Sequence, residues 1–206
     1  MKKILVLASG RGSNFQAIID ASRTQKIKGE IIALITNNIS AKAIGRAKKH
    51  HIPVYVIHSQ KNLDPRLRGD DLTFEKKLLT QCQELNPDLI VLAGYMKILP
   101  QNFIKHFKNK IINIHPALLP QFPGLHAQKQ ALQNGTKVSG CTVHFVDEGV
   151  DTGPIILQEK VPILGNDTEE TLSDRILQKE HLTLVSAIEL FCNDKLEVKE
   201  GKVYIK

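Results

Sequence analysis

The stretch that decides the fold is Ile111–Pro116, which reads IINIHP. Its β-branched residues favour a strand. Alternate side chains of a strand share a face, so Asn113 and His115 are expected to point the same way. Pro116 cannot continue a central strand, which places this pair at the strand's carboxyl end. Ligands of open α/β sheets bind at that end, and an amide beside an imidazole there suits a developing oxyanion.

Strand and helix patterns alternate on the amino-terminal side of this stretch. Strands are expected at residues 3–9, 30–36, 54–57, 89–93 and 111–114, and helices at 13–24, 41–50, 72–85 and 100–107, with a loop at 59–69. Such alternation predicts an α/β fold with a doubly wound, mostly parallel sheet and right-handed crossovers.

The pattern changes after a proline-rich loop at residues 116–124. A helix at 127–133, strands at 139–146 and 155–162, a long helix ending near 191 and a hairpin at 196–205 are expected. Asp167, with Glu170 three residues later, predicts a capping box at the start of the long helix. No linker divides the chain, so we expect one domain over residues 1–206, with an N-terminal half (1–100) and a C-terminal half (101–206).

Composition narrows the class of protein. The chain has 206 residues, of which 42% are hydrophobic and 24% charged, as in globular proteins, and no apolar run has membrane-spanning length. The apolar start reads as a buried strand rather than a leader, so a cytoplasmic protein is expected. Cys82, Cys141 and Cys192 show neither metal-ligand nor disulfide spacing. The net charge of +7 comes from scattered lysines and arginines, which suits an anionic small molecule better than nucleic acid.

A glycine-containing turn follows the first strand. Gly12, Ser13 and Asn14 stand where a helix begins, and the free N–H groups of a helix start favour phosphate. A dinucleotide site lacks its third glycine, because that position holds Phe15, and a P-loop lacks its Gly-Lys-Ser/Thr. The turn therefore indicates a monophosphate site, with a plain strand-to-helix turn as the alternative.

An acidic loop at residues 147–154 lies between two expected strands. Its composition is typical of an ordinary surface turn, and it lacks the closing Glu of a calcium loop. The sharper interpretation is that this loop supplies a catalytic carboxylate paired with His115.

Four motifs together carry a resemblance. They are Gly12-Ser13-Asn14, Asn113-Ile114-His115-Pro116-Ala117-Leu118-Leu119-Pro120, Pro123-Gly124-Leu125-His126, and Gly140-Cys141-Thr142-Val143-His144-Phe145-Val146 leading to Asp151-x-Gly153-Pro154. In this order, over nearly the whole chain, they resemble the phosphoribosylglycinamide formyltransferase family. Methionyl-tRNA formyltransferase and formyltetrahydrofolate hydrolase share the second and fourth motifs. The glycine turn, and the absence of those relatives' extra domains, favour the first family.

The resemblance implies a Rossmann-like formyltransferase fold and roles for individual residues. The expected catalytic residues are Asn113, His115 and Asp151. The expected phosphate-binding residues are Gly12, Ser13 and Asn14, and Glu180 is expected to contact the glycinamide nucleotide. The expected folate-binding residues are Met96, Lys97, Ile98, Leu99 and Asp151. Many relatives have Arg where this chain has Asp71, so Arg66 or Arg68 is considered for the folate tail.

The implied reaction is direct formyl transfer from 10-formyltetrahydrofolate to the amine of 5'-phosphoribosylglycinamide, without a metal. Asn113 and a charged His115 would stabilise the tetrahedral oxyanion, and Asp151 would raise the pKa of His115 above about 6.5. Alternatives remain. They are another 10-formyltetrahydrofolate-dependent transferase or hydrolase, a non-catalytic mononucleotide-binding module, and a zinc site from His115, His126 and Asp151. The sequence predicts neither the oligomeric state nor the role of His144.

Overall fold

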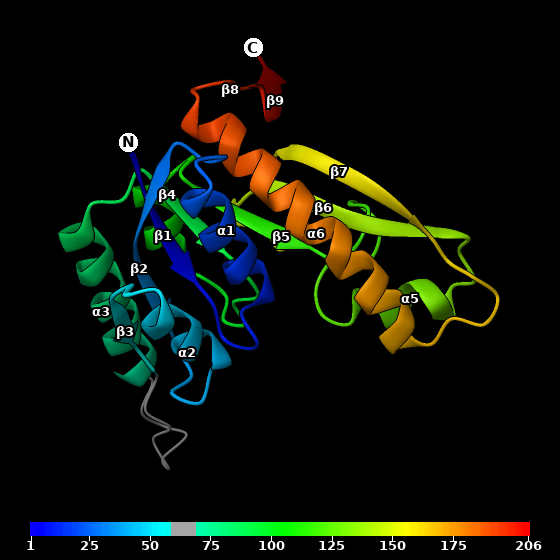
Figure 1. Cartoon of the computed structure of the whole chain (residues 1–206), viewed down its shortest axis with the longest axis horizontal. Helices are drawn as coiled ribbons and strands as arrows, with labels where there is room; N and C mark the ends of the chain where they lie inside the picture. Colours follow the sequence, from blue (N-terminus) through cyan, green and yellow to red (C-terminus); the bar gives the residue numbers. More distant parts are fainter. Residues whose placement is uncertain (59–68) are drawn as a thin grey trace.

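The computed structural model describes the backbone of residues 1–58 and 69–206, and the side chains of 1–58 and 73–206. A seven-stranded sheet of order β3-β2-β1-β4-β5-β6-β7 forms its centre (Figure 1). The strands are β1 Lys2–Leu7, β2 Gly29–Thr36, β3 Val54–Val56, β4 Leu89–Leu92, β5 Ile111–His115, β6 Val138–Phe145 and β7 Ile155–Pro162. Strands β1 to β5 run parallel, whereas β6 is antiparallel to both of its neighbours. The predicted mostly parallel α/β sheet is confirmed.

The strand order reverses between β1 and β4, which are neighbours although β2 and β3 lie between them in the chain. A reversal of this kind opens a crevice at the carboxyl ends of the two strands. The turn after β1, the segment after β4 and the end of β5 all reach this edge of the sheet. The fold therefore brings the predicted phosphate, folate and catalytic segments to one edge.

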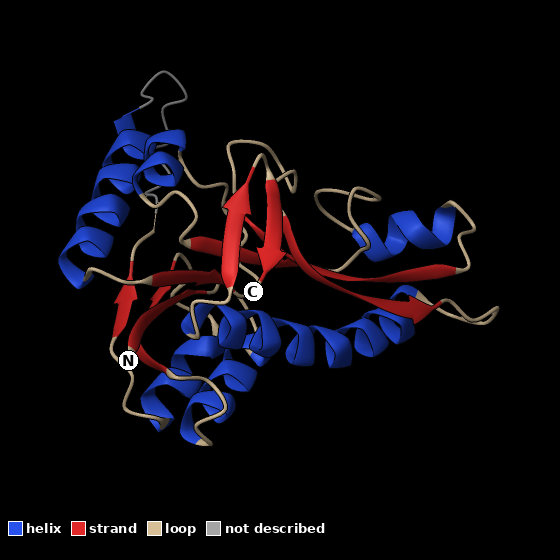
Figure 2. Cartoon of the chain, turned by 90° about the horizontal axis from the view of Figure 1, so that it is seen from above, coloured by secondary structure: helices blue, strands red, loops and turns tan. Residues whose placement is uncertain are grey.

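Helices cover both faces of the sheet (Figure 2). The helices are α1 Ser13–Arg23, α2 Lys42–Lys49, α3 Gly69–Leu85, α4 Gln101–His106, α5 Ala127–Gln133 and α6 Glu169–Cys192. One buried cluster joins α1, α2 and α6 to the sheet, and a second joins α3 and α4 to its other face. Strands β8 Leu196–Lys199 and β9 Lys202–Ile205 form the predicted terminal hairpin.

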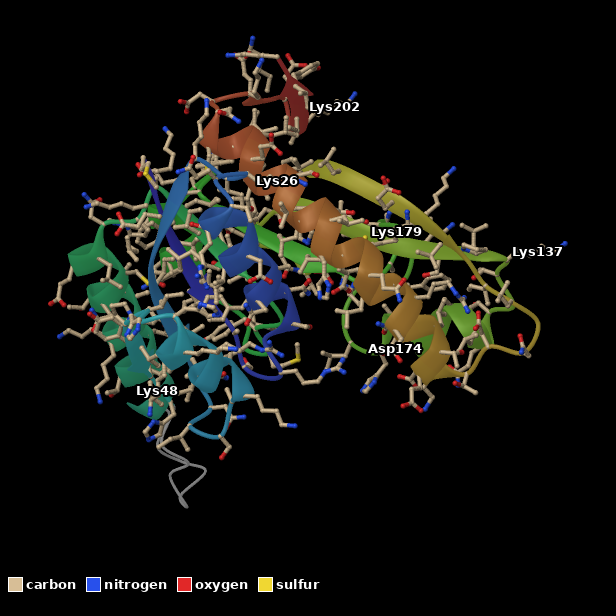
Figure 3. All side chains as sticks on the ribbon, in the orientation of Figure 1. Lys26, Lys48, Lys137, Asp174, Lys179 and Lys202 are labelled. Carbon is tan, nitrogen blue, oxygen red and sulfur yellow. The ribbon has the colours of Figure 1, made fainter. Side chains whose placement is uncertain are left out.

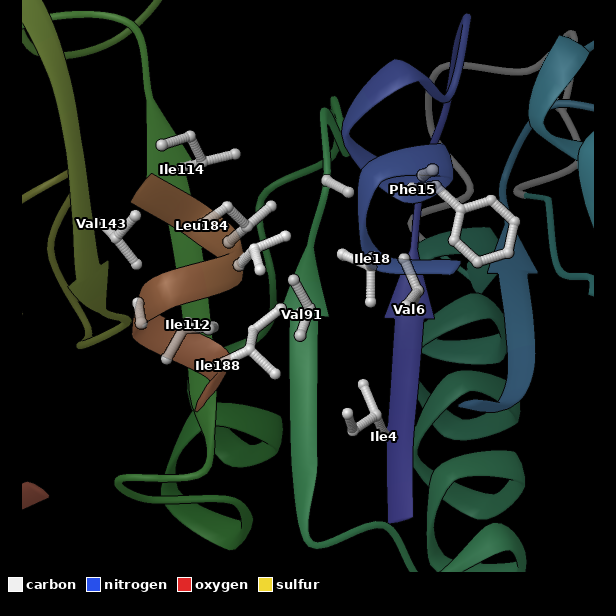
Figure 4. Packing of buried hydrophobic residues seen from close by; sticks show 14 of the residues in the cluster. Ile4, Val6, Phe15, Ile18, Val91, Ile112, Ile114, Val143, Leu184 and Ile188 are labelled. Carbon is white, nitrogen blue, oxygen red and sulfur yellow. The ribbon is translucent and has the colours of Figure 1, made fainter. Parts of the chain in front are cut away.

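Apolar side chains leave β1 on both faces, which explains its uninterrupted hydrophobic run. Ile4 and Val6 belong to the cluster under α1 and α6 (Figure 4), whereas Leu5 and Leu7 belong to the cluster under α3 and α4. Ile112 on β5 packs in the first of these clusters. Asn113 points away from that cluster, because neighbouring side chains of a strand alternate.

The start of α6 differs from the prediction. Thr168, not Asp167, is the N-cap, and its capping box is completed by Thr171 instead of Glu170. The Asp167 carboxylate binds Arg175 instead of capping the helix: the guanidinium donates to both carboxylate oxygens at 2.7 Å. The other predicted elements form with small shifts at their ends. The loop expected at 59–69 lies almost wholly outside the described residues.

Positive charge is spread over the surface. Lys26, Lys48, Lys137, Lys179 and Lys202 project from well-separated elements (Figure 3). No helix in the described parts of the chain is long and apolar enough to cross a membrane.

Candidate active site

Asn113 and His115 both reach the carboxylate of Asp151, as their positions on one face of β5 predict. Asn113 Nδ2 lies 3.4 Å from Asp151 Oδ1. His115 Nδ1 lies 3.2 Å from Asp151 Oδ2. Strand β5 ends at His115, so the three side chains meet at the carboxyl edge of the sheet. The structure thus brings together the three residues expected to be catalytic.

The imidazole of His115 is buried between two acceptors. Its Nε2 lies 2.8 Å from the carbonyl oxygen of Phe122, and a carbonyl only accepts, so Nε2 carries a proton. Nδ1, facing Asp151, carries a second proton only when the ring is charged. Burial lowers the pKa of His115 by more than the Phe122 carbonyl and the Asp151 carboxylate raise it. The expectation of a raised pKa is therefore wrong, because the ring is more deeply desolvated than the sequence suggests.

Asp151 connects two loops to the sheet. The backbone N–H of Gly124 donates to its Oδ2 at 2.8 Å, and His144 Nε2 lies 3.5 Å from its Oδ1. Burial raises the pKa of Asp151, but contact with His144, the bond from the Gly124 N–H and the charge that both nearby imidazoles carry when protonated outweigh burial, so the pKa is lowered. Asp151 has a φ of 54°, a left-handed conformation that is uncommon outside glycine. The carboxylate is thus held ionised, at some backbone cost, where Asn113 and His115 converge.

His144 completes the cluster from β6, directly opposite Asn113 in the β5–β6 ladder. Its Nδ1 lies 2.9 Å from the carbonyl oxygen of Phe145, which assigns the proton of the neutral ring to Nδ1. Its Nε2 then accepts from Asn113 Nδ2 at 3.3 Å. The mid-strand His144, whose role the sequence left open, therefore orients the Asn113 amide.

Backbone groups of the 116–124 loop were missed by sequence reasoning. The Phe122 carbonyl binds His115 and the Gly124 N–H binds Asp151, and both residues have positive φ, 54° and 79°. Thr142 anchors the start of this loop: its hydroxyl donates to Ala117 O at 2.6 Å and accepts from Leu119 N at 3.1 Å. The Pro123-Gly124 pair was the only sequence signal of such a turn.

The turn after β1 is tightly packed against α2. Gly12 has a φ of 70°, and a Cβ built on it would lie 2.8 Å from Ala43 Cβ. Among the described side chains none caps the start of α1, and the first turn of this helix contains no acidic residue. The first-turn N–H groups of a helix have no intrahelical partner, so they are available to an anion. The phosphate loop at Gly12, Ser13 and Asn14 stays a prediction, for which this turn offers free N–H groups.

The side chain of Asn14 does not face solvent. Its Nδ2 donates to Glu180 Oε2 at 2.7 Å, and both residues are buried. Burial raises the pKa of Glu180, although the bond from Asn14 and the charge of Arg11 oppose the rise. Asn14 Oδ1 is buried without a partner in the described part of the protein. The two residues predicted at different ends of the nucleotide thus form one polar pair between α1 and α6.

The expected folate segment, Met96–Leu99, follows β4 beside the catalytic residues. Met96 and Ile98 are 66% and 78% exposed, so this segment presents two apolar side chains at the surface. Lys97 Nζ lies 3.8 Å from the centre of the Phe74 ring. Leu99 packs in the core under α3 and α4. Arg66, Arg68 and the side chain of Asp71, considered for the folate tail, lie outside the described residues.

The described residues include no group of three or more His, Cys, Asp and Glu side chains suited to a metal ion. His126, considered above as a zinc ligand, instead points its Nδ1 to within 4.0 Å of Glu169 Oε1. In the described structure the imidazole of His126 therefore lies beside Glu169, not beside His115 and Asp151.

Residues 2–188 match the formyl transferase family. The chain belongs to this family. It is 39% identical to the phosphoribosylglycinamide formyltransferase of Escherichia coli strain K12, over 98% of this chain and 92% of the relative. A solved structure of glycinamide ribonucleotide transformylase 1 from Symbiobacterium toebii superposes with a TM-score of 0.92 and 43% identity, over 100% of this chain and 94% of that one. Within the formyl transferases, the chain thus groups with the phosphoribosylglycinamide formyltransferases.

A longer relative places the same unit in a larger protein. The chain is 44% identical to part of the trifunctional purine biosynthetic protein adenosine-3 of Drosophila melanogaster, over 93% of this chain but 14% of that protein. The chain therefore corresponds to one segment of this multifunctional relative and to almost the full length of the bacterial formyltransferases.

Proposed function

We propose that this formyltransferase moves the formyl group of 10-formyltetrahydrofolate to the primary amine of 5'-phosphoribosylglycinamide, a step of de novo purine biosynthesis. The observation that carries the proposal is the meeting of Asn113, His115 and Asp151 beside an uncapped helix start at one sheet edge. A phosphate held at α1 would position the nucleotide, and the three side chains would act on the amine and the formyl carbon.

The phosphate end uses the backbone of Gly12, Ser13 and Asn14 at the start of α1. Glu180, held by Asn14, would receive the glycinamide or ribose part through its remaining oxygen. Its Oε2 already accepts a hydrogen bond from Asn14, so a hydroxyl or amine of the ligand would donate to the other carboxylate oxygen, Oε1. This arrangement lets the polar pair between α1 and α6 recognise the nucleotide without a metal.

The folate end lies along Met96–Leu99 and Asp151. The exposed side chains of Met96 and Ile98 would pack on the flat ring system of the formyl donor, and backbone groups of Lys97 and Leu99 would face its edge. The segment is fixed at its start, because Met96 N donates to Ser9 Oγ at 2.9 Å. Ser9 follows β1, so the same strand end supports both substrate sites.

In the reaction, the amine nitrogen bonds to the formyl carbon while both substrates are bound. Asn113 Nδ2 would exchange one of its present acceptors for the developing oxyanion, and donors of this kind contribute roughly 3–4 kcal/mol. The new negative charge would also raise the pKa of His115, so Nδ1 could transiently hold the proton that the amine loses. Asp151, directly or through water, would pass the amine proton to the folate nitrogen as its bond to the formyl carbon breaks.

Both halves of the chain contribute to this site, so we propose that residues 1–206 act as one formyltransferase domain.

The three cysteines are free and buried. Free cysteines are usual in cytoplasmic enzymes, so we propose a cytoplasmic location.

A formyl-transfer assay with 5'-phosphoribosylglycinamide and 10-formyltetrahydrofolate tests the proposal. Formylated nucleotide should form in a one-to-one ratio with tetrahydrofolate, and the reaction should need Asn113. Tetrahydrofolate release without the nucleotide would instead identify a hydrolase. Transfer to an aminoacylated RNA, with none to the nucleotide, would identify a different transferase. Binding of both ligands without any turnover would identify a non-catalytic module.

A further inference from the structure

Arg46 of α2 bonds to the chain on both sides of Gly12. Its Nε donates to the carbonyl oxygen of Arg11 at 3.0 Å, and its Nη1 donates to Gln16 Oε1 at 3.2 Å. Gln16 is in turn oriented, because its Nε2 donates to Asp20 Oδ1 at 2.9 Å. One guanidinium thus links the turn before α1 to the first turns of α1 itself.

The bond to Arg11 fixes the direction of one peptide unit. In a trans peptide the C=O and the following N–H point in opposite directions. Because Arg11 C=O points to Arg46 on α2, the N–H of Gly12 points away from α2. The preceding unit is held likewise, since Ala43 N donates to Gly10 O at 3.2 Å. Glycines at positions 10 and 12 would otherwise let these units rotate, because glycine is conformationally permissive.

The charge of Arg46 also reaches the neighbouring helix. Burial lowers the pKa of His181 on α6, and the positive charge of Arg46 lowers it further. Arg46 is only partly exposed, so its field is screened less than that of an open surface lysine. The guanidinium therefore bonds to α1 and the turn before it, and its charge acts on His181 of α6.

We propose that Arg46 is a positioning residue for the phosphate site. Its forked guanidinium holds the Arg11–Gly12 peptide so that the Gly12 N–H, with the free N–H groups of α1, faces the ligand's phosphate. This inference rests on the proposed function only in identifying the anion as the phosphate of a ribose phosphate. Arg46 does not touch the reacting atoms, so it should affect capture of the phosphate and leave the chemical step unchanged.

The test compares three variants by calorimetric titration with ribose 5-phosphate, a probe that needs no formyl transfer. Arg46→Met keeps the length of the side chain but removes both donors and the charge. Arg46→Lys keeps the charge but cannot fork to two acceptors. Lys48→Met, at an exposed position of the same helix (Figure 3), is the matched control for loss of one positive charge.

Arg46→Met should weaken ribose 5-phosphate binding about tenfold, Arg46→Lys severalfold, and Lys48→Met by less than twofold. The affinity for 10-formyltetrahydrofolate should not change in any variant. In the transfer assay, Arg46→Met should raise KM for 5'-phosphoribosylglycinamide with little change in kcat, and should not affect the dephosphorylated glycinamide riboside.

Three results would overturn the proposal. Equal losses for the phosphorylated and dephosphorylated substrates would mean that Arg46 supports the fold in general. Full affinity in Arg46→Lys would mean that charge, not the fork, matters. Unchanged affinity in Arg46→Met would mean that the turn holds its shape without the guanidinium. If the wild type binds ribose 5-phosphate but transfers no formyl group, the proposed function fails, whereas the Arg46 comparison still gives its answer.

Discussion

His115 Nδ1 lies 3.2 Å from Asp151 Oδ2, yet the ring is so deeply buried that its pKa falls below the usual value. The carboxylate favours the imidazolium and burial disfavours it, and burial prevails. The pair is therefore poised to gain a proton when further negative charge appears nearby. An oxyanion formed at Asn113 would supply that charge.

Asp151→Asn should lower the pKa of His115 further, because it removes the charge that raises it. Turnover should fall most at neutral to alkaline pH, where the ring is more fully neutral. NMR titration of the His115 ring measures the pKa directly. Asp147→Asn is the matched control, since Asp147 bonds to its own loop at Gly149 N and Thr152 Oγ1. An unmoved pKa in Asp151→Asn would limit Asp151 to proton relay or loop structure.

The lowered pKa of His115 also predicts how stability depends on pH. Near pH 6.5 the His115 ring binds a proton in the unfolded chain but stays neutral in the folded protein. The free energy of unfolding therefore decreases as the pH falls. The contribution is fully present above about pH 6.5 and is lost as the pH falls through the lower folded pKa. Urea unfolding from pH 7.5 to 5 should show this loss, and His115→Gln should reduce it. An identical pH profile in the variant would rule His115 out as its source.

Asn113→Ala and His115→Ala should each lower turnover by about a hundredfold or more, as expected for loss of an oxyanion stabiliser. Both residues lie at a strand end, so the variants should still fold, which thermal unfolding would verify. Steady-state rates at saturating substrates are the measurement. Activity within a few-fold of the wild type in either folded variant would refute the catalytic assignment.

Ser13→Ala and Asn14→Ala should weaken binding of 5'-phosphoribosylglycinamide and leave folate affinity nearly unchanged. Asn14→Ala should also cost about 1–3 kcal/mol of stability, because it leaves the buried Glu180 carboxyl without its donor. Glu180→Gln is the control for the stability change alone, since its amide oxygen can still accept from Asn14. Calorimetry with each ligand decides the matter: equal losses for both ligands would show that the turn is structural.

Gly12→Val should weaken binding of 5'-phosphoribosylglycinamide more than Ser13→Ala or Asn14→Ala does. The smaller change Gly12→Ala should show the physical reason. The alanine Cβ would press on Ala43 Cβ, and a φ of 70° is itself unfavourable for an L-residue by roughly 1–2 kcal/mol. Adding Ala43→Gly should relieve only the clash with the Ala43 methyl group, because the Ala43 Cα, 2.9 Å from the built Cβ, and the unfavourable φ remain. Unfolding free energies of the two single variants and the double variant measure this part. If the second change brings no recovery, the Ala43 methyl group is not the reason for glycine here.

Local patterns predicted a large part of the site. The period of a strand placed Asn113 and His115 on one face, and Pro116 placed them at its end. Partnership with Asp151 came from the resemblance. Backbone partners such as Phe122 O and Gly124 N could not be predicted, because they depend on how a loop with positive φ folds over the strand.

Two errors have a common physical origin. The pKa of His115 depends on burial by the whole fold, which the neighbouring sequence does not reveal. The capping of α6 depends on Arg175, because this side chain binds the Asp167 carboxylate and Thr168 then acts as the N-cap. In both places a tertiary contact competes with a local preference and prevails.

The bond between Asn14 and Glu180 joins positions 166 residues apart. During synthesis on the ribosome, the first half of the chain emerges with its glycine turn long before α6 exists. A nascent or truncated chain would therefore lack the carboxylate that completes the proposed nucleotide site. Unfinished copies of the protein should not compete with finished enzyme for the nucleotide in the cell.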